Sequence, residues 1–174
     1  MLEKTGTVQI YTGDGKGKTT AGIGAAVRAA GHGWKVAIIQ FMKGRLYGEI
    51  ASAGRLNNIT IEQHGRDEFV DPENPAPVDV EMAQKGWERA RELAAGGNID
   101  MLILDEINIA ENFGLIDLDE ILEFINHRPP SLEIIMTGRR AHSRLIEMAD
   151  TVTEMREIKH HYRNAVKARK GIEY

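Results

Sequence analysis

The sequence predicts an α/β protein with three layers, in which a mostly parallel central sheet of about six strands lies between two layers of helices. Short apolar runs alternate with segments of helical periodicity along the whole chain, which is the pattern of repeated βαβ units. The run 101–104 is apolar at every position, as expected for a strand that helices cover on both faces. Such units have right-handed crossovers and place binding loops at the carboxyl ends of their strands.

The first half of the chain contains three expected strands and two expected helices. The strands cover residues 7–12, 35–41 and 59–62, and the helices cover 19–30 and a short segment near 49–56. Gly31-His32-Gly33 ends the first of these helices. A stretch rich in Pro, Asp and Glu over 66–77 is expected to form a long loop.

The second half continues the alternation. Asp79 is expected to cap a helix whose small and apolar residues follow the spacing of one helical face. Asp117 and Glu120 are spaced like a capping box for a helix over 117–127, which the two prolines that follow cannot continue. Further strands are expected over 101–104, 132–136 and 151–155, a further helix over 141–148, and an irregular tail over 159–174.

Composition limits the classes of function. With 174 residues and no internal repeat or low-complexity linker, residues 1–174 are expected to form a single domain. The chain has no cysteine, which excludes disulfides, thiolate metal sites and cysteine nucleophiles. A net charge of −4 argues against nucleic-acid binding, although the basic run 156–170 fits either a phosphate-facing patch or a solvated edge. No signal peptide or membrane-length apolar run occurs, so we expect no membrane association and a cytoplasmic location.

The run Thr-Gly-Asp-Gly-Lys-Gly-Lys-Thr-Thr at 12–20 has the composition of a triphosphate-binding loop between a strand and a helix. Its glycines let backbone N–H groups converge on phosphate oxygens, Lys18 adds a point charge, and Thr19 offers a hydroxyl to Mg²⁺ at the helix N-terminus. The residues expected to bind the phosphates are Gly13, Asp14, Gly15, Lys16, Gly17, Lys18, Thr19 and Thr20.

The loop departs from the generic motif at its first position, because Thr12 stands five residues before Gly17 where a glycine is usual. We expect Gly13 and Gly15 to supply the flexibility instead. The alternative is a glycine-rich turn before an ordinary helix, but Gly-Lys-Thr-Thr directly after a strand favours phosphate binding.

Further candidates follow the later strands at the same edge of the sheet. Asp105 and Glu106 end the strand at 101–104, where either carboxylate can bind Mg²⁺ directly or through water, although polar residues also end strands with no such role. Arg139, preceded by Gly138, follows the next strand and can clamp triphosphate oxygens. Arg28, farther along the first helix, is either a second clamp or an exposed helix residue.

The histidines do not indicate a hydrolase or a metal centre. None of the six has a His-x-x-x-His spacing or a nearby arrangement of Ser and Asp, so a hydrolytic triad is unsupported. The adjacent pair His160 and His161 is expected to project in different directions, as ordinary loop or interface residues.

With these motifs the chain resembles the P-loop ATP:corrinoid adenosyltransferases, enzymes of cobalamin biosynthesis and salvage, over nearly its whole length. Beyond the loop at 12–20, the resemblance rests on the segments 28–33, 40–44, 104–106, 137–139, 149–155, 158–160 and 170–174. It implies a RecA-like fold, a homodimer, and transfer of the 5′-deoxyadenosyl group of ATP to the Co(I) centre of cobalamin or a precursor corrinoid, with release of triphosphate.

The resemblance also implies roles for the candidate residues. Cobalt is the nucleophile and attacks the ribose C5′, so no side chain forms a bond and the protein supplies positioning and charge. The loop and Lys18 hold the triphosphate, Thr19 and Glu106 hold Mg²⁺, and Arg139 and Arg28 assist. A reductant such as a flavoprotein is the implied partner.

Phe69, in the long loop, stands where the family carries an aromatic residue that covers the corrin. That residue helps to displace the lower axial ligand, which makes Co(II) four-coordinate and easier to reduce. From its own neighbourhood in the sequence, Phe69 is either a lid aromatic or the anchor of the loop in the core. Asp71 stands where many members carry a second aromatic residue, a tryptophan. Some members also have an N-terminal extension that helps to close the site, so closure here is expected either to come from another element or to be looser.

Two other functions would use the same loop. In a kinase or ATPase, a hydroxyl or water attacks the γ-phosphate, and in a nucleotide-dependent switch the loop controls a partner. The guanine-reading motif Asn-Lys-x-Asp is absent, which disfavours a GTPase switch.

Overall fold

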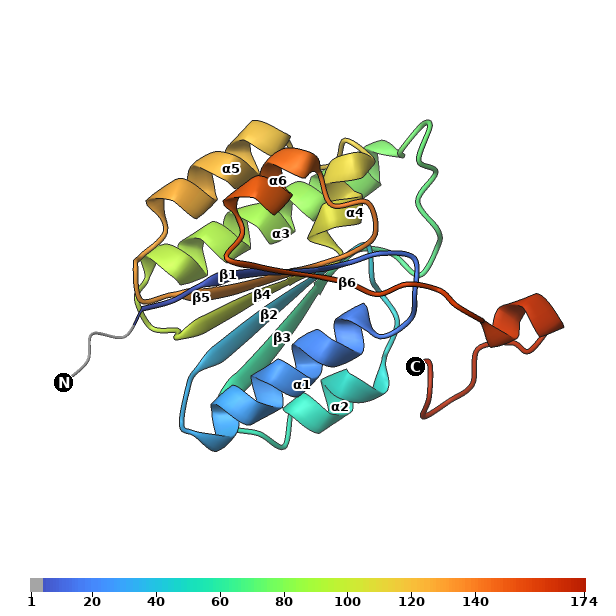
Figure 1. Ribbon diagram of the computed structural model, residues 1–174, viewed down its shortest axis with the longest axis horizontal. Helices are drawn as coiled ribbons and strands as arrows, with labels where there is room; N and C mark the ends of the chain where they lie inside the picture. The colour runs from blue at the N-terminus through green and yellow to red at the C-terminus, as the bar shows by residue number, and fades with distance from the viewer. Residues whose placement is uncertain (1–4) are drawn as a thin grey trace.

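A six-stranded sheet, parallel throughout, runs through the centre of the computed structural model, which describes residues 5–174 (Figure 1). The order across the sheet is β3-β2-β4-β5-β1-β6. The strands are β1 (Val8–Thr12), β2 (Val36–Phe41), β3 (Ile59–His64), β4 (Met101–Asp105), β5 (Glu133–Thr137) and β6 (Thr151–Glu154). The predicted α/β class and the predicted number of strands are confirmed.

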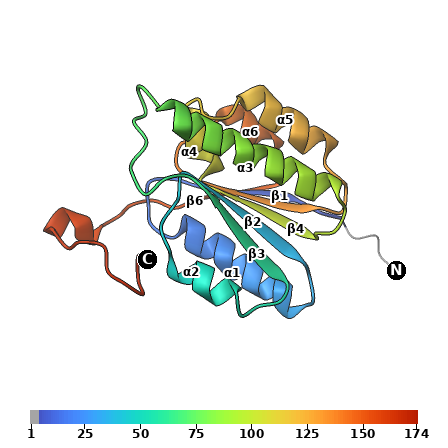
Figure 2. The same cartoon turned by 180° about the vertical axis from the view of Figure 1, so that it is seen from behind.

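Helices cover both faces of the sheet, as Figures 1 and 2 show from opposite sides. One face carries α1 (Lys18–Gly31) and α2 (Gly48–Ala53). The other face carries α3 (Pro77–Ala95), α4 (Ile107–Asn112), α5 (Leu118–His127) and α6 (Ser143–Met148). Within residues 5–174, no helix combines the length and the apolar character that a membrane crossing requires.

The continuous apolar run of β4 is explained by its position between two hydrophobic clusters. Leu102 and Leu104 belong to the cluster that includes Trp87 of α3. Met101 and Ile103 belong to the cluster beneath α1. Since successive side chains of a strand point to opposite faces, a strand buried on both faces needs an apolar residue at every position.

The helix that follows the long loop begins earlier than the sequence indicated. Pro77 is its first residue and Ala76 precedes it as the cap, so the predicted capping role of Asp79 is wrong. Asp79 lies in the first turn instead, where Nε and Nη2 of Arg66 each donate a hydrogen bond of 2.8 Å to its buried carboxylate. This pair fastens the start of the long loop to α3.

The predicted cap of α5 is half confirmed. The carboxylate of Asp117 accepts hydrogen bonds from the backbone N–H groups of Asp119 and Glu120. Glu120 does not complete the capping box, because its Oε2 accepts a hydrogen bond of 2.8 Å from Nε1 of Trp87. The side chain therefore connects α5 to α3.

Two short helices lie where none was predicted. One is α4, directly after Glu106, and the other is a 3₁₀ helix, η1 (His161–Asn164), within the segment expected to be irregular. The stretch predicted as a helix near 49–56 ends sooner, at Ala53, and β3 extends to His64.

Candidate active site

The loops that follow β1, β2, β4 and β5 meet at the carboxyl edge of the sheet, and the C-terminal tail returns to the same edge (Figure 1). A cavity of about 1020 Å³ lies there. Its lining includes the phosphate-loop residues Asp14 to Thr20, together with Lys43, Phe69, Glu106, Arg139 and the C-terminal residues Gly171 to Tyr174. Most of the predicted candidates therefore share one cavity.

The phosphate loop has the backbone conformation that its glycines permit. Gly13 and Gly17 have φ angles of 93° and 117°, and Gly17 is the cap from which α1 begins. The backbone N–H of Gly15 donates a hydrogen bond of 2.6 Å to the carbonyl of Met155. A side chain would not fit at this contact, since a Cβ at Gly15 would lie 2.6 Å from that carbonyl oxygen.

Thr12 has a structural role that explains its departure from the glycine of the generic motif. Its side chain is buried, and its hydroxyl accepts a hydrogen bond of 3.2 Å from the backbone N–H of Ala141. The contact joins the start of the phosphate loop to the segment after β5, which carries Arg139. Gly13 has a positive φ angle as expected, but the second positive φ angle of the loop belongs to Gly17 and not to Gly15.

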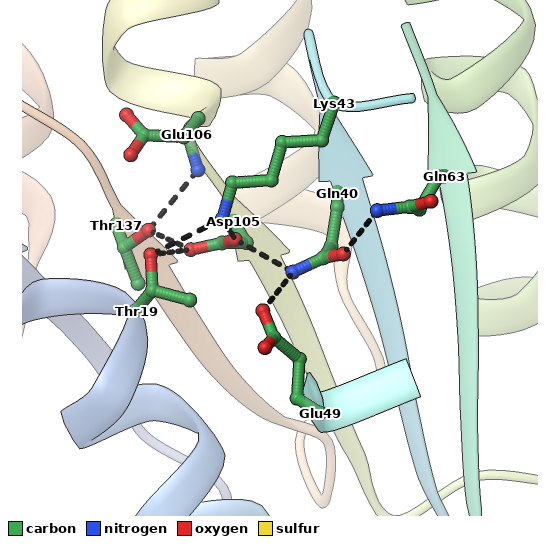
Figure 3. Close-up of polar contacts among 8 residues, drawn as sticks. All are labelled: Thr19, Gln40, Lys43, Glu49, Gln63, Asp105, Glu106 and Thr137. Carbon is green, nitrogen blue, oxygen red and sulfur yellow. Dashed lines mark hydrogen bonds and ion pairs between the residues drawn. The ribbon is translucent and has the colours of Figure 1, made fainter. Parts of the chain in front are cut away.

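Asp105 lies at the centre of a hydrogen-bond network below the loop (Figure 3). Its Oδ1 accepts from the hydroxyls of Thr19 and Thr137 at 2.8 and 2.6 Å. Its Oδ2 accepts from Nζ of Lys43 at 2.6 Å and from Nε2 of Gln40 at 3.1 Å. Thr19 donates its only proton to Asp105, so its oxygen can only accept from or coordinate other partners, and Nζ of Lys43 at 3.4 Å is one of these.

Lys43 is a site residue that the sequence analysis did not assign a role. It follows β2, the neighbour of β4, and its ammonium lies among the carboxylates of the site. Burial alone would lower the pKa of Lys43, but the charge and hydrogen bond of Asp105 outweigh this effect and raise the pKa. The signal available in the sequence was its place, two residues beyond a strand, at the edge where the other candidates cluster.

Glu106 differs from Asp105 in having a free carboxylate. Its backbone lies in the left-handed region at φ 66°, and its N–H donates to Oγ1 of Thr137 at 3.0 Å. Figure 3 shows the carboxylate turned away from the network, and the described residues give it no hydrogen bond or ion pair. Burial raises the pKa of Glu106, and the neighbouring charge of Asp105 adds to the effect.

The hydroxyl oxygen of Thr19 and the carboxylate oxygens of Glu106 are of the chemical type that binds Mg²⁺. Hydroxyl and carboxylate oxygens are the donors that Mg²⁺ takes from proteins, usually one or two of them, with phosphate and water completing the octahedron. Among residues 5–174, no group of three or more acidic, His or Cys side chains is arranged to hold a metal ion. The donor set at Thr19 and Glu106 fits a metal that shares its coordination with a bound nucleotide.

The two candidate arginines are separated by the structure. Arg139 lines the cavity, and its Nε lies 3.9 Å from Oδ1 of Asp14 in the phosphate loop. Arg28 is exposed in the last turn of α1 and is not part of the cavity lining. Because a helix rises 1.5 Å per residue, Arg28 lies about 15 Å along the axis from Lys18.

Phe69 is fully exposed at the lip of the cavity. The interpretation of Phe69 as an anchor of the loop in the core is therefore wrong. Val70 has that role, since it is the residue of this loop that packs against the core, and the Arg66–Asp79 pair fixes the loop nearby. Asp71 does not line the cavity, and its carboxylate accepts a local hydrogen bond from the N–H of Glu73.

The C-terminal tail forms one wall of the cavity. Oε1 of Glu173 lies 2.7 Å from Nζ of Lys16 in the phosphate loop and 3.2 Å from Nη2 of Arg169. These contacts hold the carboxylate pKa of Glu173 far below its usual range. Arg163 of the basic run is likewise paired, with Glu157 at 2.6 Å. At these positions the basic run is balanced by acidic neighbours.

The adjacent histidines do not point apart as expected. The rings of His160 and His161 stack with their centroids 4.5 Å apart. Nδ1 of His160 accepts a hydrogen bond from the N–H of Tyr162, so this histidine caps the 3₁₀ helix.

Comparison with known proteins agrees with the geometry. Residues 4–174 match the model of the family described as ATP:corrinoid adenosyltransferase BtuR/CobO/CobP. A corrinoid adenosyltransferase of Escherichia coli K12 is 36% identical over 179 residues, covering 99% of this chain and 87% of its own length. A corrinoid adenosyltransferase of a Sinorhizobium species is 38% identical over 182 residues, with 99% and 82% covered. The corrinoid adenosyltransferase CobA of Salmonella typhimurium LT2 is 34% identical over 178 residues, with 99% and 87% covered. The chain belongs to the ATP:corrinoid adenosyltransferase family.

Proposed function

We propose that the carboxyl edge of the sheet binds ATP by its triphosphate and exposes the ribose C5′ to the Co(I) centre of a corrinoid. In this reaction the Co–C5′ bond forms with the electron pair of cobalt. The C5′–O bond breaks, and the whole triphosphate leaves with the bonding pair. The observation that carries the proposal is the shared cavity, which joins the phosphate loop, the free carboxylate of Glu106 and the exposed ring of Phe69.

The loop residues neutralise and orient the leaving group. In the structure the ammonium of Lys18 donates to the carbonyls of Gly13 and Gly15, so its charge is already held inside the loop. Triphosphate oxygens bind there by accepting from this ammonium and from the N–H groups at the start of α1, a 14-residue helix with the positive end of its dipole at the loop. Arg139 adds a second cation beside Asp14.

Thr19 and Glu106 are the residues proposed to hold Mg²⁺, with Asp105 in support. Bound there, the metal ion would neutralise charge on the triphosphate. Asp105 fixes the direction of the Thr19 hydroxyl through a hydrogen bond of 2.8 Å. The carboxylate of Glu106 is unpaired, so a ligand does not first have to displace a protein partner.

The corrin is proposed to lie against the long loop. Phe69 projects from this loop without packing of its own, so its ring is available to cover an apolar ligand. We further propose that the protein is a homodimer of single-domain chains and that a flavoprotein supplies electrons. The cytoplasm is the proposed location, because its reducing conditions suit the formation of Co(I).

The test is an analysis of products. The protein is incubated with ATP, Mg²⁺, a corrinoid and a strong chemical reductant, and phosphorus NMR and the absorbance of the corrinoid are followed together. Adenosylcorrinoid and triphosphate are expected in equal amounts. Release of ADP or orthophosphate without a corrinoid product would show attack at phosphorus and favour a kinase or ATPase.

A further inference from the structure

The carboxylate of Asp105 has no acceptor capacity left for a metal ion. It accepts four hydrogen bonds, two at each oxygen, at distances between 2.6 and 3.1 Å. A carboxylate offers about four lone-pair directions, so a cation that binds Asp105 directly must displace one of these donors. Three of them are the neutral groups of Thr19, Gln40 and Thr137.

The fourth donor, Lys43, is the one that carries a charge. Its Nζ lies 2.6 Å from Oδ2 of Asp105 and 3.4 Å from Oγ1 of Thr19. Both partners are enclosed, with the side chain of Lys43 14% exposed and that of Asp105 1% exposed. The ammonium also lies 5.2 Å from the centre of the Tyr47 ring. A buried cation thus lies against the carboxylate of Asp105 and beside the hydroxyl of Thr19, which is one of the two residues proposed to hold Mg²⁺.

We propose that Lys43 is the counter-ion of the empty site, and that it makes the binding of a divalent cation depend on the nucleotide. This inference rests on the proposed site for Mg²⁺ at Thr19 and Glu106. Without ATP, Lys43 neutralises Asp105 and repels a second cation, while Glu106 alone is too weak a ligand to retain one. With ATP, the triphosphate supplies the additional negative charge and oxygen donors, and the cation enters with it.

Removal of the ammonium should therefore create a metal site in the empty protein. In Lys43→Met the buried charge of Asp105 loses its partner, and an unpaired buried carboxylate is costly. A divalent cation held by Asp105 would restore neutrality, with the hydroxyl of Thr19 as a neighbouring donor. Lys43 acts through Asp105, so it is a positioning residue and forms no bond in the reaction.

The experiment measures Mn²⁺ binding to the nucleotide-free protein by the EPR signal of the free ion. Lys43→Met should bind Mn²⁺ roughly tenfold or more tightly than the wild type. Lys43→Arg keeps the charge and should behave as the wild type. Lys85→Met is the matched control, because Lys85 is an exposed lysine paired with Glu81 on the surface of α3. The gain should disappear when Asp105→Asn is added to Lys43→Met.

Equal affinity of Lys43→Met and the wild type for Mn²⁺ would overturn the proposal, as would a gain that persists with Asp105→Asn. If Lys43→Met does not fold, the same titration is made with Lys43→Gln, which keeps a hydrogen-bond donor but no charge. Either of the two results above would overturn the proposal for this variant too. Thermal melts give a second measurement: Mn²⁺ should raise the Tm of the neutral variant and leave that of the wild type unchanged. These assays measure Mn²⁺ binding and Tm without corrinoid or turnover. A negative result would therefore reject the role of Lys43 without bearing on the proposed adenosyl transfer.

Discussion

The ammonium of Lys18 lies 2.7 Å from the carbonyl oxygen of Gly15, within the loop that it is expected to serve. A second hydrogen bond, to the carbonyl of Gly13, completes the enclosure. Burial lowers the pKa of Lys18, and the nearby carboxylate of Glu106 partly opposes this effect. The loop thus holds its cation ready for phosphate, and binding exchanges carbonyl acceptors for phosphate oxygens.

Lys18→Ala should lower adenosyl transfer by roughly a hundredfold or more, because it removes a charge that stabilises the leaving triphosphate. Calorimetry should show a matching loss of ATP affinity, while circular dichroism should show an intact fold. Lys85→Ala, on the surface of α3, is the control and should leave both values unchanged. Turnover near that of the wild type in Lys18→Ala would contradict the role of the loop.

Gly15→Ala should displace the phosphate loop. The new methyl group would lie 2.6 Å from the carbonyl oxygen of Met155, so the loop or the end of β6 must move, at a cost of about 1–3 kcal/mol in the free energy of unfolding. Gly24→Ala is the matched control, since a Cβ in that helical position meets nothing within 4 Å and should stabilise α1 by about 0.5–1 kcal/mol. Urea denaturation and ATP titration check both. Equal effects of the two substitutions would exclude the close contact with Met155 as the cause.

Phe69→Ala should leave stability unchanged, because the ring packs against nothing in the structure. Activity that starts from Co(II) should fall by roughly tenfold or more, and activity with pre-reduced Co(I) should fall less, since the ring is proposed to act on the coordination of cobalt. Val70→Ala, by contrast, should lower the free energy of unfolding by about 1 kcal/mol, because Val70 packs against the core. Its activity should depend less on the oxidation state of cobalt than that of Phe69→Ala. Equal losses with both oxidation states in Phe69→Ala would remove the proposed role in ligand displacement.

The Arg66–Asp79 pair should make stability depend on pH. The hydrogen bonds that Arg66 donates to Asp79 hold the pKa of this carboxyl group below its usual value. A carboxyl group with a lowered pKa in the folded state stabilises the protein above its usual pKa of about 4, and this contribution disappears as the pH falls through the lower folded value. Asp79→Asn should therefore cost about 1–3 kcal/mol at pH 7. Unfolding curves of the variant and the wild type should converge in acid, and a difference that stays constant with pH would refute the assignment.

Glu173→Gln should release the tail from the phosphate loop. The substitution removes the charge that binds Lys16 at 2.7 Å and Arg169 at 3.2 Å, so the turn at residues 171–174 loses its attachment. Amide hydrogen exchange in this turn should become faster, and the KM for ATP should rise. Glu157→Gln, which breaks the neighbouring pair with Arg163, is the control and should leave exchange at 171–174 unaltered. Unchanged exchange in Glu173→Gln would show that the tail is held by other contacts.

The sequence predicted those features that depend on neighbours in the chain. Gly13 and Gly17 are required by the positive φ angles of the loop, Lys18 bonds to carbonyls of the same loop, and the apolar run of β4 follows from burial on both faces. The cap at Asp117 was predicted for the same reason, since its acceptors and donors lie within three residues.

The features that were missed or misplaced depend on contacts between distant segments. Asp79 is a residue type that often caps helices, but its carboxylate accepts hydrogen bonds from Arg66 at the other end of the long loop. Lys43 stands in the segment 40–44 that carries the resemblance, but its contact with Asp105 depends on the pairing of β2 with β4. The helix α4 has six residues, fewer than two helical turns, so the repeat of one apolar face is too short to distinguish it from a loop.

The wall that residues 171–174 contribute to the cavity has a practical consequence for handling the protein. Because Tyr174 lines the cavity, a polypeptide fused after it would begin beside the proposed binding sites of ATP and corrinoid and would compete with them for space. The first described residues lie at the opposite edge of the sheet (Figure 1), so labels, tethers and reporter domains attached on that side should leave the cavity accessible.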